Sequence, residues 1–150
     1  MHMSDVCIRP MEAKDIDAVL EVERQSFDTP WSREAFENEV DNDLAYYLIL
    51  VNENRVIGYG GMWIIVDEAH ITNIALLPAY REKGLGKRLL SAMISLAKDK
   101  GARSMTLEVR VSNTPAKKLY DSFGFEECGL RQGYYTDNNE DALIMWLKSL

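Results

Sequence analysis

A glycine-rich turn between a strand and a long helix is the feature that most constrains this chain. The strand is expected over His70–Leu76 and the helix over Gly84–Lys100, where apolar side chains recur on one face at helical spacing. The turn itself is Arg81-Glu82-Lys83-Gly84-Leu85-Gly86. Gly101 then stops the helix, and a strictly alternating segment over Ser104–Val111 predicts a further strand. A chain with this order of elements folds as layers of helix on sheet.

Further elements flank this segment on both sides. The other expected strands are Val6–Arg9, Tyr46–Val51, Arg55–Val66, Phe125–Leu130 and Ala142–Leu147, the second and third forming a hairpin. The other expected helices are Ala13–Gln25, a short one capped by Ser32 that runs to Val40, and one that ends at Phe123, with Thr114 as its N-cap and Pro115 as its first residue. Glu23 falls on the apolar face of the first helix. A long polar loop containing Tyr134 and Tyr135 is expected before the last strand. The pattern predicts the α+β class, with a mostly antiparallel central sheet and about four helices in a single domain over residues 1–150.

The balance of charges argues against nucleic acid as the main partner. The chain has 17 lysines and arginines against 24 aspartates and glutamates, a net charge of −7. A protein that binds a duplex needs a basic surface to displace counterions, whereas an acidic surface suits an amine-bearing partner. The two cysteines exclude a disulfide-dense scaffold and favour a reducing compartment, the cytoplasm. The longest apolar runs, such as Tyr46–Val51, are too short to cross a bilayer, so no membrane association is expected.

The turn before the long helix is the first candidate binding site. Its glycines let the backbone bend sharply, and the free N–H groups of a helix N-terminus attract anions, a pyrophosphate above all. Two known phosphate motifs do not fit, since Leu89 stands where a dinucleotide fingerprint needs its third glycine and no Gly-Lys-Ser/Thr follows. A turn that merely starts a helix is an equally good interpretation of the pattern alone.

Glu108 is the first candidate catalytic residue. It is the single carboxylate in the middle of the alternating strand, between Leu107 and Val109. Partial burial would raise its pKa and make it a usable general base. From the residues alone, a solvated position or an ion pair with Arg110 or a lysine is the more common outcome.

Tyr120 is the second candidate. It shares the apolar face of its helix with Ala116, Leu119 and Phe123, which is typical of a core tyrosine. Its hydroxyl could instead donate a proton at the surface of the sheet. Asn113, which precedes this helix, has the position of a turn or capping residue.

Other reactive residues do not form groups along the chain. His70 stands alone on its strand, so no cluster of histidines and cysteines predicts a metal site. Cys128 follows Glu126 and Glu127, which disfavours a thiolate. Trp31, Tyr134 and Tyr135 are expected in loops, where they could line a pocket or cover an edge of the core.

Several of these motifs, in this order, resemble a known family. Arg81-x-x-Gly84-x-Gly86 after Asn73-Ile74-Ala75-Leu76-Leu77-Pro78 is similar to the acyl-CoA motif of the GCN5-related N-acetyltransferase (GNAT) superfamily. The runs Leu107–Asn113, Ala116–Tyr120 and Phe123-Gly124-Phe125 continue the resemblance. Pro30-Trp31-Ser32, Tyr134-Tyr135 and Glu140-Asp141-Ala142 extend it to the bacterial branch that acetylates the N-terminal alanine of ribosomal proteins. The resemblance spans nearly the whole chain.

The resemblance implies acetyl-CoA as co-substrate, no metal, and a role for each matching residue. Its mixed sheet would have two middle strands, His70–Leu76 and Ser104–Val111, that splay apart to admit the cofactor. Glu108 would be the general base and Tyr120 the general acid. Trp31 and Tyr134 would border the acceptor peptide. The cofactor would be held by backbone groups of Ile74, Ala75 and Leu76, by the amides of Arg81, Glu82, Lys83, Gly84, Leu85, Gly86 and Lys87, and by Asn113.

Three alternatives stay open for what the protein does and for which amine it acetylates. The resemblance implies transfer to a protein N-terminus, most of all the N-terminal alanine of a small-subunit ribosomal protein. A lysine side chain, a polyamine or another small amine is the second alternative. A module that binds acyl-CoA without turnover is the third, and Glu108 and Tyr120 argue against it. The oligomeric state stays open.

Overall fold

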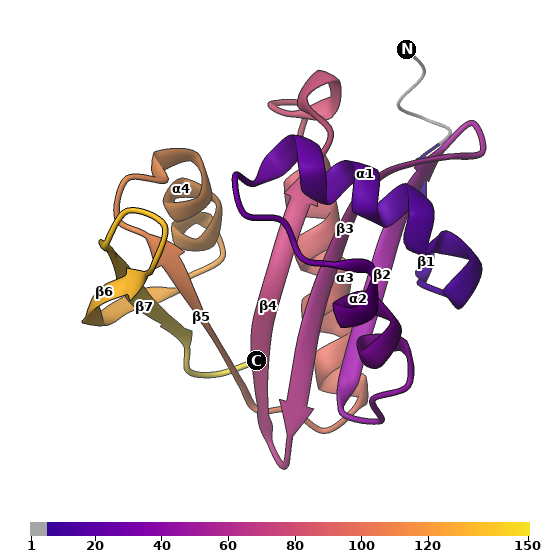
Figure 1. Ribbon diagram of the computed structural model, residues 1–150. Helices are drawn as coiled ribbons and strands as arrows, with labels where there is room; N and C mark the ends of the chain where they lie inside the picture. The colour runs from indigo at the N-terminus through magenta and orange to yellow at the C-terminus, as the bar shows by residue number, and fades with distance from the viewer. Residues whose placement is uncertain (1–5) are drawn as a thin grey trace.

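A computed structural model describes residues 6–150, which form one seven-stranded sheet (Figure 1). Every neighbouring pair of strands is antiparallel except β4 and β5, which are parallel. The strands, in their order across the sheet, are β1 (Val6–Pro10), β2 (Ala45–Asn52), β3 (Arg55–Ile65), β4 (Glu68–Leu76), β5 (Ser104–Arg110), β7 (Glu140–Leu147) and β6 (Glu126–Tyr135). The mostly antiparallel sheet and the β2–β3 hairpin are as predicted.

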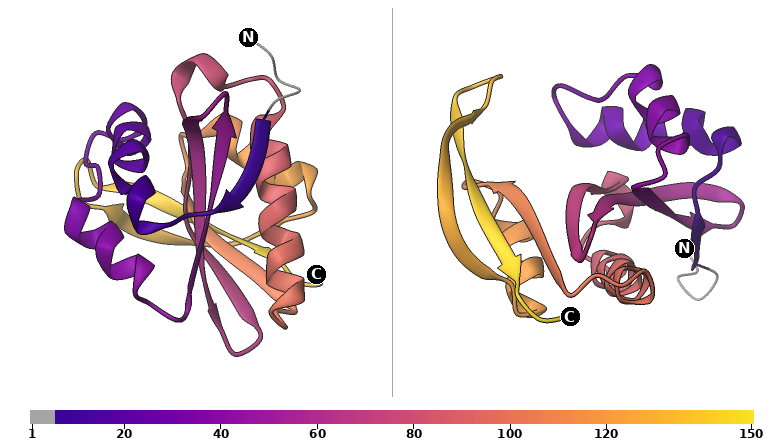
Figure 2. Two further views of the ribbon diagram at one scale, coloured as in Figure 1. Left: turned by 90° about the vertical axis from the view of Figure 1, so that its right-hand side faces the viewer. Right: turned by 90° about the horizontal axis from the view of Figure 1, so that it is seen from below.

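Helices cover both faces of this sheet. The α-helices are α1 (Ile16–Ser26), α2 (Arg33–Val40), α3 (Leu85–Asp99) and α4 (Thr114–Ser122), and Ala13–Asp15 and Pro78–Tyr80 form short 3-10 turns. α1 and α2 lie over one face of β2–β4, and α3 lies on the opposite face (Figure 2). The predicted apolar stripe of α3 is buried, including Leu89, Leu90 and Met93. Gly60 of β3 permits this close packing, because a Cβ there would collide with Met93.

The two middle strands of the sheet separate after three residue pairs. β4 and β5 pair from Glu68 opposite Ser104 to His70 opposite Thr106 and then diverge, as predicted (Figure 1). Beyond His70 the edges of both strands face a gap. The separation therefore exposes backbone groups of β4 in the middle of the sheet rather than at its margin.

A bulge in β4 lies beside this gap. Asn73 is opposite Gly61 and Ile71 is opposite Met62, so Thr72 is an extra residue. A bulge of this kind turns two successive side chains toward the same face. Thr72 accordingly faces the tyrosines below α1 and α2, since its hydroxyl lies 3.0 Å from that of Tyr47.

Two predicted details are wrong. Tyr134 and Tyr135 belong to β6 rather than to a loop, because pairing with β7, which is interrupted after Arg131, resumes with Tyr135 opposite Glu140. β6 is exposed along almost its whole length, so it lacks the alternation that would have marked it as a strand. The N-cap of α4 is Asn113, whose Oδ1 accepts a bond from the amide of Ala116 at 3.2 Å, and the helix starts at Thr114. Within the described residues, no helix is long and apolar enough to span a membrane.

Candidate active site

A cleft of about 590 Å³ opens where β4 and β5 separate. One wall consists of the end of α1 and the loop that follows it, and the other of β5, the start of α4 and the β6–β7 turn. Five predicted site residues line it: Trp31, Ile74, Glu108, Asn113 and Tyr120. The cleft therefore brings the two predicted catalytic residues to one space, although they are far from each other along the chain.

The edge of β4 offers backbone groups to this cleft. The amide of Leu77 donates to the carbonyl of Ile57 on β3 at 2.8 Å. Because bonding alternates along an antiparallel pair, Ala75 also bonds to β3, whereas Ile74 and Leu76 direct their backbone groups toward the gap. The carbonyl of Leu76 confirms this direction, since it accepts a bond from Arg81 Nε at 3.0 Å. Of the three predicted backbone contacts, Ile74 and Leu76 thus face the gap and Ala75 does not.

The turn before α3 presents free amides. Glu82 and Gly84 have left-handed backbone conformations, with φ of 61° and 81°, and Gly84 is the N-cap of α3 without a side-chain cap. Among residues 6–150, the amides from Glu82 to Lys87 have no hydrogen-bond acceptor, whereas that of Arg81 donates to Pro78. The Arg81 side chain fastens the turn by donating to Ser26 Oγ at 3.2 Å as well as to β4. Free amides at the start of a 15-residue helix fit a phosphate group.

Glu108 lies at the centre of β5 and forms a cluster that the sequence does not reveal. His70 Nε2 donates to its Oε2 at 2.7 Å, and Arg131 Nε lies 3.5 Å from its Oε1. The carboxylate side chain is 11% exposed. The bond from His70 holds the pKa of Glu108 below its ordinary value, against the opposing effect of burial. The expectation of a raised pKa is therefore wrong, because burial brings Glu108 against a histidine and an arginine.

His70 belongs to the candidate site, although nothing in the sequence marks it. It belongs to β4, next to β5, and its bond to Glu108 raises its own pKa. The two residues are 38 positions apart and meet because the parallel pairing of β4 and β5 ends at His70. That register is a property of the folded sheet and leaves no local signal in the sequence.

Tyr120 extends from α4 to the cleft. Its side chain is buried against Phe125, with ring centroids 5.5 Å apart, and it lines the cleft beside Asn113 and Ala116. Burial raises the pKa of its hydroxyl. A phenol in this setting keeps its proton near neutral pH and can donate it.

Glu23 supports the opposite wall. It is 1% exposed, and its Oε2 accepts a bond from the amide of Trp31 at 2.8 Å. Its Oε1 accepts a bond from the hydroxyl of Tyr59. The ring of Trp31 packs against Phe36 at 5.4 Å. The carboxylate on the apolar face of α1, visible in the sequence, thus fixes the loop that borders the cleft.

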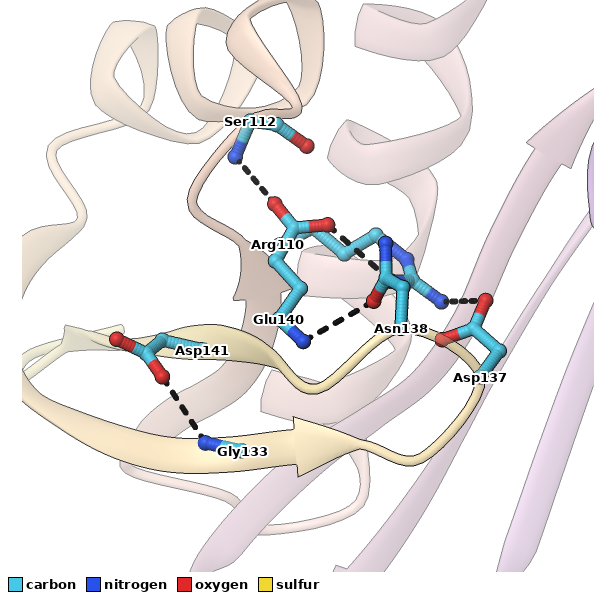
Figure 3. A network of polar contacts seen from close by, with 7 residues as sticks. All are labelled: Arg110, Ser112, Gly133, Asp137, Asn138, Glu140 and Asp141. Carbon is cyan, nitrogen blue, oxygen red and sulfur yellow. Dashed lines mark hydrogen bonds and ion pairs between the residues drawn. The ribbon is translucent and has the colours of Figure 1, made fainter.

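A polar network fixes the β6–β7 turn beside the cleft (Figure 3). Arg110 donates to Asp137 at 2.8 Å, to Asn138 at 3.1 Å and to Glu140 at 3.2 Å. Glu140 also accepts a bond from the amide of Ser112 at 2.8 Å. Arg110 therefore pairs with this turn and not with Glu108.

The tyrosine that lines the cleft differs from the predicted one. The guanidinium of Arg110 lies 4.0 Å from the ring centre of Tyr135, which faces the cleft. Tyr134 is 47% exposed and does not line the cleft, although it was the tyrosine expected to border the peptide. The two rings nevertheless touch edge to face, with their centroids 5.1 Å apart.

The charge of the cleft is mainly negative. Arg110 is the cationic side chain among the residues that line it. The five carboxylates that line it are Glu23, Asp28, Glu108, Asp137 and Glu140. In the part of the chain that the structure describes, no group of histidine, cysteine or carboxylate side chains could hold a metal ion. The cleft suits a ligand that carries an amine.

Comparisons with known proteins agree with this geometry. Residues 16–125 match the model of the acetyltransferase (GNAT) family. The chain is 36% identical over 143 residues to the ribosomal protein bS18-alanine N-acetyltransferase of Escherichia coli K12, covering 93% of this chain and 95% of that protein. It is 48% identical over 141 residues to a Bacillus subtilis (strain 168) protein that is provisionally given the same name, covering 93% of each.

A solved structure supports the same relationship. The crystal structure of the ribosomal-protein-S18-alanine N-acetyltransferase from Escherichia coli superposes with a TM-score of 0.89 at 34% identity, covering 97% of this chain and 95% of that one. The chain therefore belongs to the acetyltransferase (GNAT) family, in the branch that contains the ribosomal protein bS18-alanine N-acetyltransferases.

Proposed function

We propose that this protein transfers the acetyl group of acetyl-CoA to a protein N-terminal α-amine, namely that of the N-terminal alanine of ribosomal protein bS18. The observation that carries the proposal is Glu108, a carboxylate in an acidic cleft beside an open strand edge. The acceptor is inferred from relatives that are named for it and that match this chain over 93% of its length. We also propose that residues 1–150 act as one catalytic domain in the cytoplasm, where ribosomal proteins are made.

The residues present fit acetyl-CoA, which supplies a thioester whose carbonyl is open to attack. The free amides from Glu82 to Lys87 would hold its pyrophosphate. The gap-facing backbone groups of Ile74 and Leu76 would line its acyl arm, and an amide of this edge would stabilise the oxygen charge that develops on the carbonyl. Asn113, at the start of α4, would contact the cofactor further along.

Glu108 would act as the general base. An α-amine has a pKa of about 7.7–8.0, so near neutral pH much of it is protonated and cannot attack. The lowered pKa of Glu108 keeps its carboxylate ionised there and ready to accept a proton, directly or through a water. The bond from His70 fixes the orientation of that carboxylate.

Tyr120 would act as the general acid. Its raised pKa keeps the hydroxyl protonated until the thiolate departs beside it. The thiolate would take this proton and become a thiol, whose pKa of about 8.5 lies below that of a tyrosine, so the transfer has little driving force of its own, and the tyrosinate would then recover a proton from water. Protonation blocks the reverse attack, while the alignment of both substrates in one cleft supplies most of the acceleration.

A panel of acceptors tests the proposed function. It compares a peptide with the N-terminal sequence of bS18, the same peptide with a blocked N-terminus and a free lysine, and a polyamine, each with acetyl-CoA. We expect thiol release and a mass increase with the free N-terminus alone. Equal or faster acetylation of the lysine or the polyamine would contradict the proposal and favour a different amine as acceptor.

A further inference from the structure

We propose that Glu23 is a positioning residue of the acceptor site, which holds the loop of residues 27–31 in the shape that binds the acceptor and thereby sets the KM for the acceptor. The inference rests on the proposed function, because it concerns how the acceptor is held. Glu23 lies in the last turn of α1. The loop joins α1 to α2 at the end of α1 that faces α4, across the cleft (Figure 1).

The loop has little else to hold it. Asp28, Thr29 and Trp31 line the cleft. Among residues 6–150, the stretch from Asp28 to Trp31 makes one hydrogen bond, which the amide of Trp31 donates to Glu23 Oε2 at 2.8 Å. The ring of Trp31 also packs against Phe36. A short exposed segment with a single hydrogen bond opens readily when that bond is lost.

The core fixes Glu23 in turn. Glu23 is 1% exposed, and its Oε1 accepts a bond from the hydroxyl of Tyr59 on β3. Tyr59 is fully buried, and the centroid of its ring lies 5.6 Å from that of Phe36 and 6.3 Å from that of Tyr47. Burial of a carboxylate is unfavourable unless hydrogen bonds compensate for the lost water, and here each oxygen accepts one. Glu23 thus ties the backbone of the loop to a well-packed part of the core.

Such a tie favours acceptor binding rather than turnover. A binding loop that is ordered before the ligand arrives binds it more tightly, because the entropy of ordering is lost in folding and not in binding. Without the bond from Trp31 to Glu23, the acceptor has to order the loop itself. The bound loop then has the same shape as in the wild type, so the reacting groups remain aligned and kcat is unchanged. The proposed acetyl-CoA site lies on other elements, the edge of β4 and the turn before α3.

Asp15 supplies a matched control at the other end of α1. It is 6% exposed, and it likewise accepts a backbone amide, that of Glu12 at 2.8 Å, and a side-chain donor, Arg9 at 2.8 Å. Asp15 is not among the residues that line the cleft. Glu23→Met and Asp15→Leu therefore each replace a buried, hydrogen-bonded carboxylate by an apolar side chain of similar size, one that lines the cleft and one that does not.

Steady-state kinetics of these variants test the proposal. We expect Glu23→Met to raise the KM for the acceptor about tenfold, as the loss of one hydrogen bond predicts, with kcat and the calorimetric Kd for acetyl-CoA within about twofold of the wild type. Asp15→Leu should also lower the melting temperature but change none of these three constants. Hydrogen exchange of the amides in residues 27–31 should be faster in Glu23→Met alone.

A conservative variant separates the position of the loop from the charge of Glu23. Glu23→Gln has an oxygen that can accept from the Trp31 amide and an NH₂ group that can donate to the oxygen of Tyr59. Both links therefore remain, and we expect an acceptor KM within about threefold of the wild type. If Glu23→Gln is impaired as strongly as Glu23→Met, the charge matters rather than the position, and the proposal is wrong.

Three other results would overturn the proposal. They are an unchanged acceptor KM in folded Glu23→Met, an equal rise of KM in Asp15→Leu, and a loss of kcat or of acetyl-CoA affinity in place of the effect on KM. If melting curves show that Glu23→Met does not fold, Tyr59→Phe replaces it, since it removes one bond to Glu23 and keeps the ring. Tyr59→Phe should raise the acceptor KM less strongly, and an unchanged KM would refute the positioning role.

The kinetics use whichever amine the wild-type protein acetylates best in the panel of acceptors. A wild-type preference for a lysine or a polyamine would refute the proposed acceptor, while the comparison of Glu23 with Asp15 still tests the positioning role.

Discussion

At the scale of single residues, the proposed chemistry depends on the environment of Glu108. The sequence predicts its position in the middle of a strand, and the structure places it in the cleft as expected. The sequence could not predict its partner, because His70 is 38 residues away and contacts it through the pairing of two strands. The same limit explains the wrong sign of the predicted pKa shift, since burial alone raises the pKa of a carboxylate and a neighbouring histidine lowers it.

Replacement of Glu108 tests its role as a base. Glu108→Gln keeps the shape of the side chain but cannot accept a proton from the amine. We expect kcat to fall by roughly 10²–10⁴-fold, the usual contribution of a positioned acid or base, with the acetyl-CoA Kd unchanged. A series of turnover measurements over pH checks this, and near wild-type turnover of the variant would remove Glu108 from the mechanism.

Replacement of Tyr120 tests the acid in the same way. Tyr120→Phe removes the hydroxyl and leaves the ring packed against Phe125. We expect a fall in kcat within or somewhat below the range of roughly 10²–10⁴-fold, with unchanged melting temperature and acetyl-CoA affinity. If kcat stays the same while the protein loses stability, Tyr120 is a core residue and the acid lies elsewhere.

The pair of His70 and Glu108 predicts a pH dependence of stability. The pKa of His70 is raised, so its contribution to the free energy of unfolding is complete below about pH 6.5 and is lost as the pH rises through the raised pKa. The pKa of Glu108 is lowered, so its contribution is present above about 4.5 and is lost as pH falls through the lowered value. In urea unfolding, the free energy of unfolding of the wild type should therefore exceed that of His70→Gln by most at a pH of about 4.5 to 6.5. A difference that is constant from pH 4 to pH 9, or that grows toward high pH, would contradict the charged pair.

At the scale of elements, strong periodicity made most of the fold predictable. α3 and β5 each bury one face in the core, so their apolar residues recur at helical spacing in α3 and at every second position in β5. β6 is an exposed edge strand without that constraint, and the sequence therefore predicts a loop at Tyr134 and Tyr135, where β6 continues and Tyr135 pairs with Glu140 of β7. The N-cap of α4 was misplaced by one residue, because Asn113 and Thr114 are both good capping residues.

The two ends of α3 provide a test of the phosphate site. Gly84 at its start and Gly101 after its end both have left-handed backbones, with φ of 81° and 91°, and a Cβ on either would meet open space. A valine at either position adds strain of about 1–2 kcal/mol or more. We expect Gly84→Val to lose acetyl-CoA binding by calorimetry, because the turn that carries the amides rearranges. Gly101→Val should lose similar stability but bind as the wild type, and equal affinity of both variants would refute the proposed phosphate site.

At the scale of the whole molecule, the separation of β4 and β5 unites the two halves of the site. The half that contains α1 and β1–β4 supplies the loop of Trp31 and the buried Glu23, and the half that contains β5–β7 and α4 supplies Glu108, Tyr120 and the turn held by Arg110. The sequence reveals the motifs of each half but not the distances between them. Those distances depend on three residue pairs between parallel strands, a long-range feature that single-chain patterns do not report.

The most direct test of the account is mass spectrometry of a peptide with the N-terminal sequence of bS18 after incubation with acetyl-CoA and either the wild-type protein or Glu108→Gln. We predict one acetyl group on the α-nitrogen of the N-terminal alanine with the wild type, and a rate lower by roughly two orders of magnitude or more with the variant. Acetylation at another nitrogen, or equal rates for the two proteins, would contradict a cleft in which Glu108 deprotonates an N-terminal amine.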